Sequence, residues 1–333
     1  MRVLLYLLIP FCLLACATPR VQMTSDTTQV PVLTPVYATM ADGYRLPVSV
    51  WQPAAEPQAI ILGLHGFNDY RLAFTAAAEF MAASGIVTYA YDQRGFGETE
   101  QRGIWPGAGV LQQDASTMVQ LLCEHYPGIP LYLLGESMGG AVVMDMVEEA
   151  ETACLDGVVL IAPAVWGWQT MPAWQRSILW MAAHTAPAQT LTGEGLEITP
   201  SDNVEMLRAL GRDPLVIKAT RVDAMYGLTN LMESALLSSQ QINLPTLILY
   251  GENDDIIPPN SVCEMMKGLP DSPAARWQMV LYPEGYHMLT RDLQADVVLQ
   301  DLVSWIHDRS LSLPSDLEVD TGTPRVRAMC GGS

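Results

Sequence analysis

Residues 135–140 read Gly-Glu-Ser-Met-Gly-Gly, and the rest of the fold can be worked out from this stretch. An apolar run, residues 131–134, precedes it, and an apolar segment of helical length, residues 138–150, follows it. The pattern predicts a buried strand, a sharp turn and a helix, with Ser137 at the turn. Glycines flank the serine because so tight a turn leaves no room for Cβ atoms. The first turn of the helix would present unpaired backbone N–H groups to an anion at Ser137.

Strand-like and helix-like segments alternate on both sides of this stretch. The predicted strands are residues 36–40, 44–51, 59–64, 86–91, 131–134, 158–162, 246–250 and 277–281. The predicted helices are residues 71–84, 111–123, 138–150, 259–269 and 296–309. This alternation indicates an α/β fold with an open, mostly parallel central sheet flanked by helices on both faces.

The alternation is interrupted between residues 165 and 240. That segment is helical in pattern and holds four of the eight tryptophans. We interpret it as a helical cap inserted between two parts of one core, residues 35–164 and 241–311. The cap is either a buried helical subdomain or a lid whose inner face lines an apolar pocket. Residues 312–333 lack periodicity, which predicts a flexible tail.

The N-terminus has the pattern of a targeting segment. Residues 1–15 combine Arg2 with an apolar run that is too short to span a bilayer. They end in Leu-Leu-Ala before Cys16, which resembles a bacterial lipobox. The resemblance implies cleavage before Cys16 and lipid attachment to its thiol; the alternative is an ordinary secretory signal peptide. Residues 16–34 are polar and rich in Pro and Thr, which is typical of a tether.

We therefore expect a lipid-anchored protein of the bacterial cell envelope. Ala17, rather than Asp, follows the cysteine, so the inner-membrane retention signal of Gram-negative lipoproteins is absent, and a Gram-negative host would place the chain at the outer membrane. The formal charge of −19 argues against nucleic-acid partners, because phosphates would be repelled. Membrane association must then come from the anchor or from apolar surface.

The remaining cysteines do not have the spacing of a metal site, and we expect neither a metal nor an organic cofactor. They are Cys123, Cys154, Cys263 and Cys330. A Cys123–Cys154 disulfide and free buried thiols are both compatible with an exported chain.

A serine at such a turn becomes nucleophilic only when a base takes its proton and an acid orients that base. The expected chain order is serine, acid, histidine. His287 is the candidate base, because it alone of the five histidines lies downstream of the candidate acids and in a loop after a predicted strand. Asp254 and Asp255 both follow the predicted strand 246–250. The carboxyl ends of parallel strands are where ligands bind in open α/β sheets.

The transition state also needs two N–H donors for the developing oxyanion. Met138, directly after the serine, is one candidate. Phe67 is the other, because it follows His65-Gly66 at the end of the predicted strand 59–64.

These motifs together resemble the α/β-hydrolase superfamily, and most closely its monoacylglycerol lipase and lysophospholipase group, including members with a Glu before the nucleophile. They are His65-Gly66, Asp92-x-Arg94-Gly95-x-Gly97, Gly135 to Gly140, Gly251-x-x-Asp254 and Gly285-x-His287. The resemblance implies the α/β-hydrolase fold with a helical cap, and an ester substrate whose acyl chain lies under the cap.

The resemblance also implies roles for single residues: Ser137 as nucleophile, Asp254 rather than Asp255 as acid, and His287 as base. After His65-Gly66 the chain reads Phe-Asn-Asp-Tyr, where monoacylglycerol lipases frequently have a Gly-Glu-His type of run. The identity of the leaving alcohol therefore stays open.

The leading hypothesis is a serine esterase or lipase that cleaves lipid-like carboxylic esters, of the monoacylglycerol or lysophospholipid type, through an acyl-enzyme. A small-ester carboxylesterase and a prolyl-iminopeptidase-like peptidase are alternatives on the same fold. A non-catalytic surface binding lipoprotein is a further alternative. A dehalogenase is excluded, because its nucleophile would be Asp where Ser137 stands.

Overall fold

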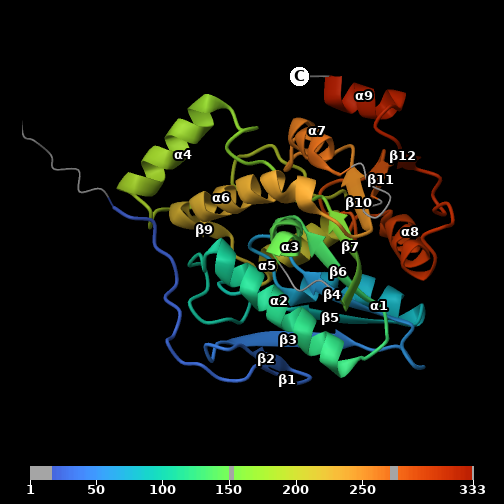
Figure 1. Cartoon of the computed structure of the whole chain (residues 1–333). Coiled ribbons are helices and arrows are strands. Elements are labelled where there is room, and N and C mark those ends of the chain that lie inside the picture. Colours follow the sequence, from blue (N-terminus) through green and yellow to red (C-terminus); the bar gives the residue numbers. More distant parts are fainter. Residues whose placement is uncertain (1–16, 150–153, 271–276, 332–333) are drawn as a thin grey trace, which may run out of the picture.

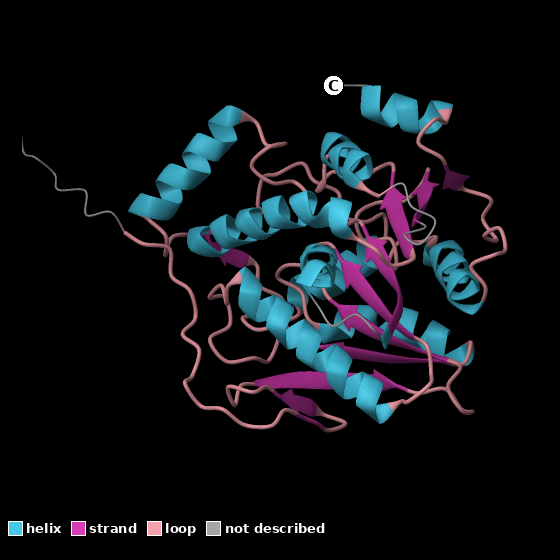
Figure 2. Cartoon of the chain, in the orientation of Figure 1, coloured by secondary structure: helices cyan, strands magenta, loops and turns pink. Residues whose placement is uncertain are grey.

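The structure is a computed structural model that describes residues 17–149, 154–270 and 277–331. The predicted lipidation site, Cys16, lies outside these residues. A twisted central sheet runs through the molecule, with helices on both sides (Figures 1 and 2). Its strands are, in spatial order, β1 (Val32–Leu33), β2 (Tyr37–Thr39), β3 (Arg45–Trp51), β5 (Ile86–Tyr91), β4 (Ala59–Leu64), β6 (Leu131–Glu136), β7 (Leu155–Ile161), β10 (Thr246–Gly251), β11 (Trp277–Tyr282) and β12 (Glu318–Val319).

The middle of this sheet is parallel from β5 through β11, and its edges are antiparallel. The central strands are buried on both faces, as their continuous apolar sequences predict. Successive residues of β4 point to opposite faces, so Ile60 and Leu62 belong to one core cluster and Ile61 to the other. The predicted fold class, an α/β-hydrolase fold with a mostly parallel sheet between helices, is confirmed.

The helices divide between the two faces of the sheet. α1 (Thr75–Ala83), which follows the short 3-10 helix η1 (Arg71–Phe74), packs on one face together with α8 (Ala295–His307). The opposite face is covered by α2 (Ala108–His125), α3 (Met138–Glu149) and α7 (Pro259–Gly268). The two cores are separate apolar layers, one on each face of the sheet.

The segment between β7 and β10, called the insertion below, contains more than helices. It comprises α4 (Ala173–Thr185), β8 (Thr190–Thr192), α5 (Val204–Arg212), β9 (Ala219–Arg221), α6 (Val222–Ser238) and the 3-10 turn η3 (Ser239–Gln241). β8 and β9 pair with each other in an antiparallel ribbon that the sequence pattern did not indicate, because three-residue strands are too short to show a period. α6 packs along α3, while α4 lies at the periphery (Figure 1).

Residues 312–331 are not the flexible tail that their sequence predicts. β12 adds to the sheet beside β11, and α9 (Pro324–Gly331) is held on α7 by a Cys263–Cys330 disulfide. Leu313 and Val326 are buried. Isolated apolar residues and one covalent bond anchor this segment, and neither produces a periodic pattern.

Residues 17–34, predicted as a tether, contact the domain at several points. Val32 and Leu33 form β1 at the edge of the sheet, and Gln22 is buried against the Trp105 loop. A second disulfide joins Cys123 and Cys154, one of the two states the sequence left open.

Candidate active site

The candidate catalytic residues all lie at the carboxyl ends of neighbouring parallel strands. Phe67 follows β4, Ser137 follows β6, Asp254 follows β10 and His287 follows β11. The strand order β4-β6-β7-β10-β11 brings these four loops to one edge of the sheet, which is where ligands bind in open α/β sheets.

Ser137 is the single residue between the end of β6 and the start of α3. Its φ of 52° lies in the left-handed region, which is costly for a residue with a side chain. The backbone is held there because Ser137 N–H donates to Ile161 O at 2.9 Å and Ala164 N–H donates to Ser137 O at 3.0 Å. The sharp turn leaves the serine side chain only half-buried at the end of the strand.

The two flanking glycines are required by close packing. A Cβ on Gly139 would lie 1.9 Å from the carbonyl oxygen of Leu64, and a Cβ on Gly135 would lie 2.5 Å from the backbone of Gly139. Both distances are well inside van der Waals contact. The turn thus packs directly against the end of β4, which carries the Phe67 loop.

Asp254 and His287 form a hydrogen-bonded pair. Nδ1 of His287 donates to Oδ2 of Asp254 at 2.8 Å, and both side chains are buried. The other oxygen of Asp254 accepts from the N–H groups of Ile256 and Ile257 at 2.8 and 2.9 Å. These bonds fix the carboxylate. Because the carboxylate accepts a hydrogen bond from Nδ1–H of His287, the proton stays on Nδ1 and Nε2 is the basic nitrogen.

Asp255, the other candidate acid, is exposed and lies 3.5 Å from the backbone N–H of Thr199. It forms no hydrogen bond with His287 among the described residues. The loops that carry Asp254 and His287 touch through glycines, because a Cβ on Gly251 would lie 2.4 Å from the oxygen of Gly285. Ser137 and His287 are not joined by a hydrogen bond in the described structure, and such contacts often form only when substrate is bound.

The two candidate oxyanion donors are placed by different means. Met138 occupies the first turn of α3, where its N–H has no acceptor within the helix. Phe67 lies inside a turn that is closed by a hydrogen bond from Asp69 N–H to Gly66 O at 3.3 Å. The N–H of Phe67 takes no part in that bond. A Cβ on Gly66 would lie 3.4 Å from Cβ of Ser137, so this turn directly adjoins the serine.

Buried His65 holds the Phe67 turn in place. Its Nε2 accepts from the Gln93 N–H at 3.0 Å, so Nδ1 carries the proton and donates to Gly66 O at 2.8 Å. Burial lowers the pKa of His65, which keeps the ring neutral. His65 therefore braces the turn.

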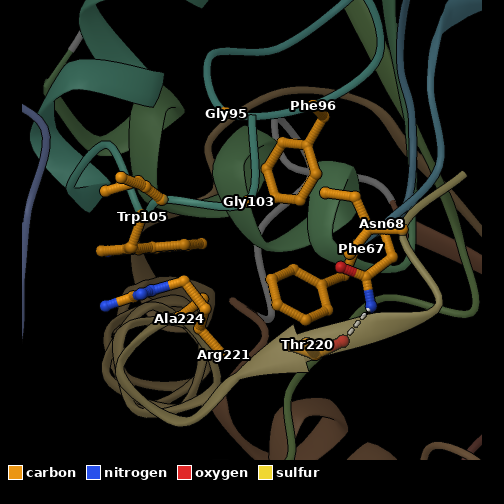
Figure 3. A pocket seen from close by; sticks show the side chains of 11 residues that line it. Phe67, Asn68, Gly95, Phe96, Gly103, Trp105, Thr220, Arg221 and Ala224 are labelled. Carbon is orange, nitrogen blue, oxygen red and sulfur yellow. Dashed lines mark hydrogen bonds between the residues drawn. The ribbon is translucent and has the colours of Figure 1, made fainter. Parts of the chain in front are cut away.

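Apolar side chains pack behind Phe67 (Figure 3). Its ring meets the Phe96 ring edge-on, with centroids 5.5 Å apart, and Trp105 lies beyond it. Asn68 donates to the Thr220 hydroxyl at 2.6 Å, which joins the turn to the insertion. The cavity between these groups is about 10 Å³, room for a water molecule but not for an acyl chain.

A buried cation, which sequence reasoning missed, joins three of the four loops. Arg291 lies four residues after His287 and donates to Asp69 and Glu136, each at 2.7 Å. Asp69 belongs to the Phe67 turn, and Glu136 directly precedes Ser137. Burial by itself would lower the pKa of Arg291, but the two carboxylates outweigh it, raise the pKa and keep the guanidinium charged. The only available sequence signal was a Glu before the serine.

The insertion is fastened to the loop that carries His287. Asp292 accepts from the hydroxyl of Ser201 at 2.6 Å and from the N–H of Tyr286 at 2.8 Å. Met288 N–H donates to Pro200 O at 3.0 Å. Burial raises the pKa of Asp292 to about 6.

The fold and this arrangement of serine, histidine and carboxylate define a serine hydrolase of the α/β-hydrolase superfamily. Residues 55–294 match the family model described as serine aminopeptidase, S33, and the chain belongs to that family. Its family and its sequence similarity to monoacylglycerol lipases place it among carboxylic ester hydrolases.

The sequence relatives include monoglyceride and monoacylglycerol lipases. The monoglyceride lipase of Mus musculus is 27% identical over 277 residues, which cover 81% of this chain and 89% of that protein. The monoacylglycerol lipase of Mycolicibacterium smegmatis is 25% identical over 285 residues, which cover 79% of this chain and 93% of that protein. The structure of a soluble variant of monoglyceride lipase from Saccharomyces cerevisiae, in complex with a substrate analog, superposes with a TM-score of 0.69 at 21% identity, covering 88% of this chain and 99% of that one.

Proposed function

We propose that this chain hydrolyses lipid-like carboxylic esters, of the monoacylglycerol or lysophospholipid type, through an acyl-enzyme on Ser137. The observation that carries the proposal is the buried Asp254–His287 pair at the sheet edge that also bears the strained serine. The relatives support the substrate class, because the mouse monoglyceride lipase and the mycobacterial monoacylglycerol lipase align over most of their length.

The chemistry follows from the positions of these groups. Nε2 of His287 takes the hydroxyl proton of Ser137 while Oγ attacks the ester carbonyl, and Asp254 stabilises the resulting imidazolium. The N–H groups of Phe67 and Met138 donate to the oxyanion. The imidazolium then gives its proton to the departing alcohol, which leaves an acyl group on Ser137. Water, deprotonated by His287, cleaves this second ester and releases the fatty acid.

We further propose that the chain is a lipoprotein of the bacterial envelope, acylated at Cys16 after removal of residues 1–15. The lipobox-like sequence supports this proposal. Within residues 17–149, 154–270 and 277–331, no helix has the length and apolar character needed to cross a bilayer. A lipid anchor would keep the enzyme at the phase in which lipid esters reside.

The test is hydrolysis of monoacylglycerols and matched simple esters from acetate to stearate, by the wild type beside Ser137→Ala. We expect a maximum at medium or long acyl chains that is lost in the variant while its thermal unfolding is unchanged. A maximum at acetate would leave the serine chemistry but make the enzyme a small-ester carboxylesterase. Turnover of aminoacyl anilides alone would favour the peptidase that the family description names.

A further inference from the structure

Asn68, the residue directly after the candidate oxyanion donor Phe67, has a strained backbone. Its φ of 67° lies in the left-handed region, where asparagine is tolerated better than most other residues with a side chain. Asn68 is the third residue of the turn that is closed by the bond from Asp69 N–H to Gly66 O, and a positive φ at this place favours Gly or Asn. The conformation of Asn68 therefore determines the shape of the turn.

The shape of this turn decides where the N–H of Phe67 points. Gly66 O and Phe67 N–H belong to the same trans peptide group, in which the oxygen and the N–H point in opposite directions. Two bonds hold Gly66 O, one from Asp69 N–H and one from Nδ1 of His65. The direction of the Phe67 N–H is therefore held as well.

The insertion holds Asn68 through two hydrogen bonds. The side-chain amide of Asn68 donates to the hydroxyl of Thr220 at 2.6 Å, the dashed line in Figure 3, and Ile217 N–H donates to Asn68 O at 3.0 Å. Thr220 belongs to β9, where it is paired with Leu191 of β8. The short ribbon of β8 and β9 thus supports the turn from the side of the insertion.

The two residues that follow Asn68 are anchored as well. The Tyr70 hydroxyl donates to Asp213 of the insertion at 2.6 Å. Asp69 accepts from Arg291 at 2.7 Å, and both Asp69 and Tyr70 are buried. Each of residues 68–70 therefore bonds to a segment outside the turn, and two of the three bond to the insertion.

We propose that Asn68 and Thr220 are positioning residues: through their hydrogen bond, the insertion fixes the Phe67 turn in the conformation in which its N–H receives the oxyanion. The bond acts through Phe67, so its loss should weaken binding of the transition state more than binding of the substrate. The inference rests on the proposed function, whose transition state carries this oxyanion. It gives the insertion a role in catalysis that is separate from holding an acyl chain.

The experiment removes the bond from each of its two sides. Thr220→Val replaces the hydroxyl by a methyl group of similar size, and Thr220→Ser keeps the hydroxyl. Asn68→Gly removes the amide but allows the left-handed backbone. Asn230→Ala is the matched control, because it removes a side-chain bond that lies within the insertion, from Nε1 of Trp168 at 2.8 Å.

Two sets of quantities are measured: kcat and KM for a soluble p-nitrophenyl ester, and the affinities for an alkyl trifluoromethyl ketone and for the corresponding alcohol. Ser137 adds to the ketone carbonyl and creates an oxyanion, whereas the alcohol cannot form one. We expect Thr220→Val and Asn68→Gly each to lower kcat and the ketone affinity about tenfold, with KM and the alcohol affinity unchanged. Thr220→Ser and Asn230→Ala should stay within about twofold of the wild type.

The double variant Asn68→Gly/Thr220→Val tests whether the two residues act through one bond. Its loss of kcat should be no larger than that of either single variant, because the first substitution already removes the interaction. Additive losses would show that the two side chains act separately and would overturn the proposal. Thermal unfolding like that of the wild type shows that the variants fold, since the bond is only partly buried.

Other outcomes also decide the inference. Equal losses of ketone and alcohol affinity, or a higher KM with unchanged kcat, would overturn it, because the bond would then not act on the oxyanion. A loss in Thr220→Val that Thr220→Ser shares would overturn it too, since the hydroxyl would not be the cause. A wild type that cleaves the p-nitrophenyl ester but no lipid ester, with the ketone affinity lost in Thr220→Val, would contradict the proposed substrate and support this inference.

Discussion

Arg291 donates a hydrogen bond of 2.7 Å to the carboxylate of Glu136, the residue directly before Ser137. The same guanidinium reaches Asp69, in the turn that positions Phe67. One side chain from the His287 loop therefore holds two other turns in place: the turn that carries Ser137 and the turn that carries Phe67. Because all three groups are almost fully buried, their charges depend on one another.

Arg291→Met should destabilise the protein and lower kcat together. Loss of the cation leaves two buried carboxylates unpaired, which costs about 3–5 kcal/mol of unfolding free energy. Denaturant unfolding and ester kinetics measure the two effects. The triple variant Asp69→Asn/Glu136→Gln/Arg291→Met removes all three charges of this cluster and should regain stability without regaining kcat. A single variant with wild-type stability and wild-type kcat would show that Arg291 does not position these loops.

Asp254→Asn should lower kcat by about 10³-fold or more, with little change in KM. The amide cannot hold the proton on Nδ1 of His287 and stabilise the imidazolium. Asp255→Asn is the matched control, because Asp255 is an exposed neighbour in the same loop, and its kcat should stay within a factor of about two. Comparable losses in the two variants would contradict the assignment of Asp254 as the acid.

Gly251→Ala should reduce both stability and kcat. The added methyl group would lie 2.4 Å from Gly285 O, so the loop carrying His287 must move away from Asp254. Gly109→Ala, in α2, meets no atom within 4 Å and should leave stability unchanged or slightly raised. Thermal unfolding and kcat of the two variants, measured side by side, test this contact.

Because of Asp292, the free energy of unfolding should fall as the pH rises. Its pKa is raised to about 6, above the value of about 4 for an unfolded aspartate. Between these values the unfolded state releases its proton first, so deprotonation favours unfolding. We expect the unfolding free energy of the wild type to drop relative to Asp292→Asn between about pH 4 and pH 7. If the unfolding free energies of the wild type and Asp292→Asn change in parallel with pH, Asp292 has the same pKa in the folded and the unfolded state, which would contradict the prediction.

Local patterns sufficed for the framework of this protein. The strand–turn–helix around Ser137, the other core strands and the five flanking helices were predicted to within a few residues, because hydrophobic period and glycine placement act over a few bonds. The confirmed α/β-hydrolase fold follows from the alternation of these elements. The four candidate catalytic loops could also be named, since each directly follows a predicted strand.

Contacts between distant parts of the chain needed the folded structure. The residues alone left Asp254 and Asp255 equivalent, and packing puts only Asp254 against His287. Arg291 bonds to partners 155 and 222 positions away, a pairing that no local pattern encodes. Residues 17–22 and 312–331 look unstructured in sequence, yet a few hydrogen bonds, single buried side chains and a disulfide hold them on the body. Periodicity reports which face of an element is buried, whereas specific pairing arises only when loops far apart in the chain converge.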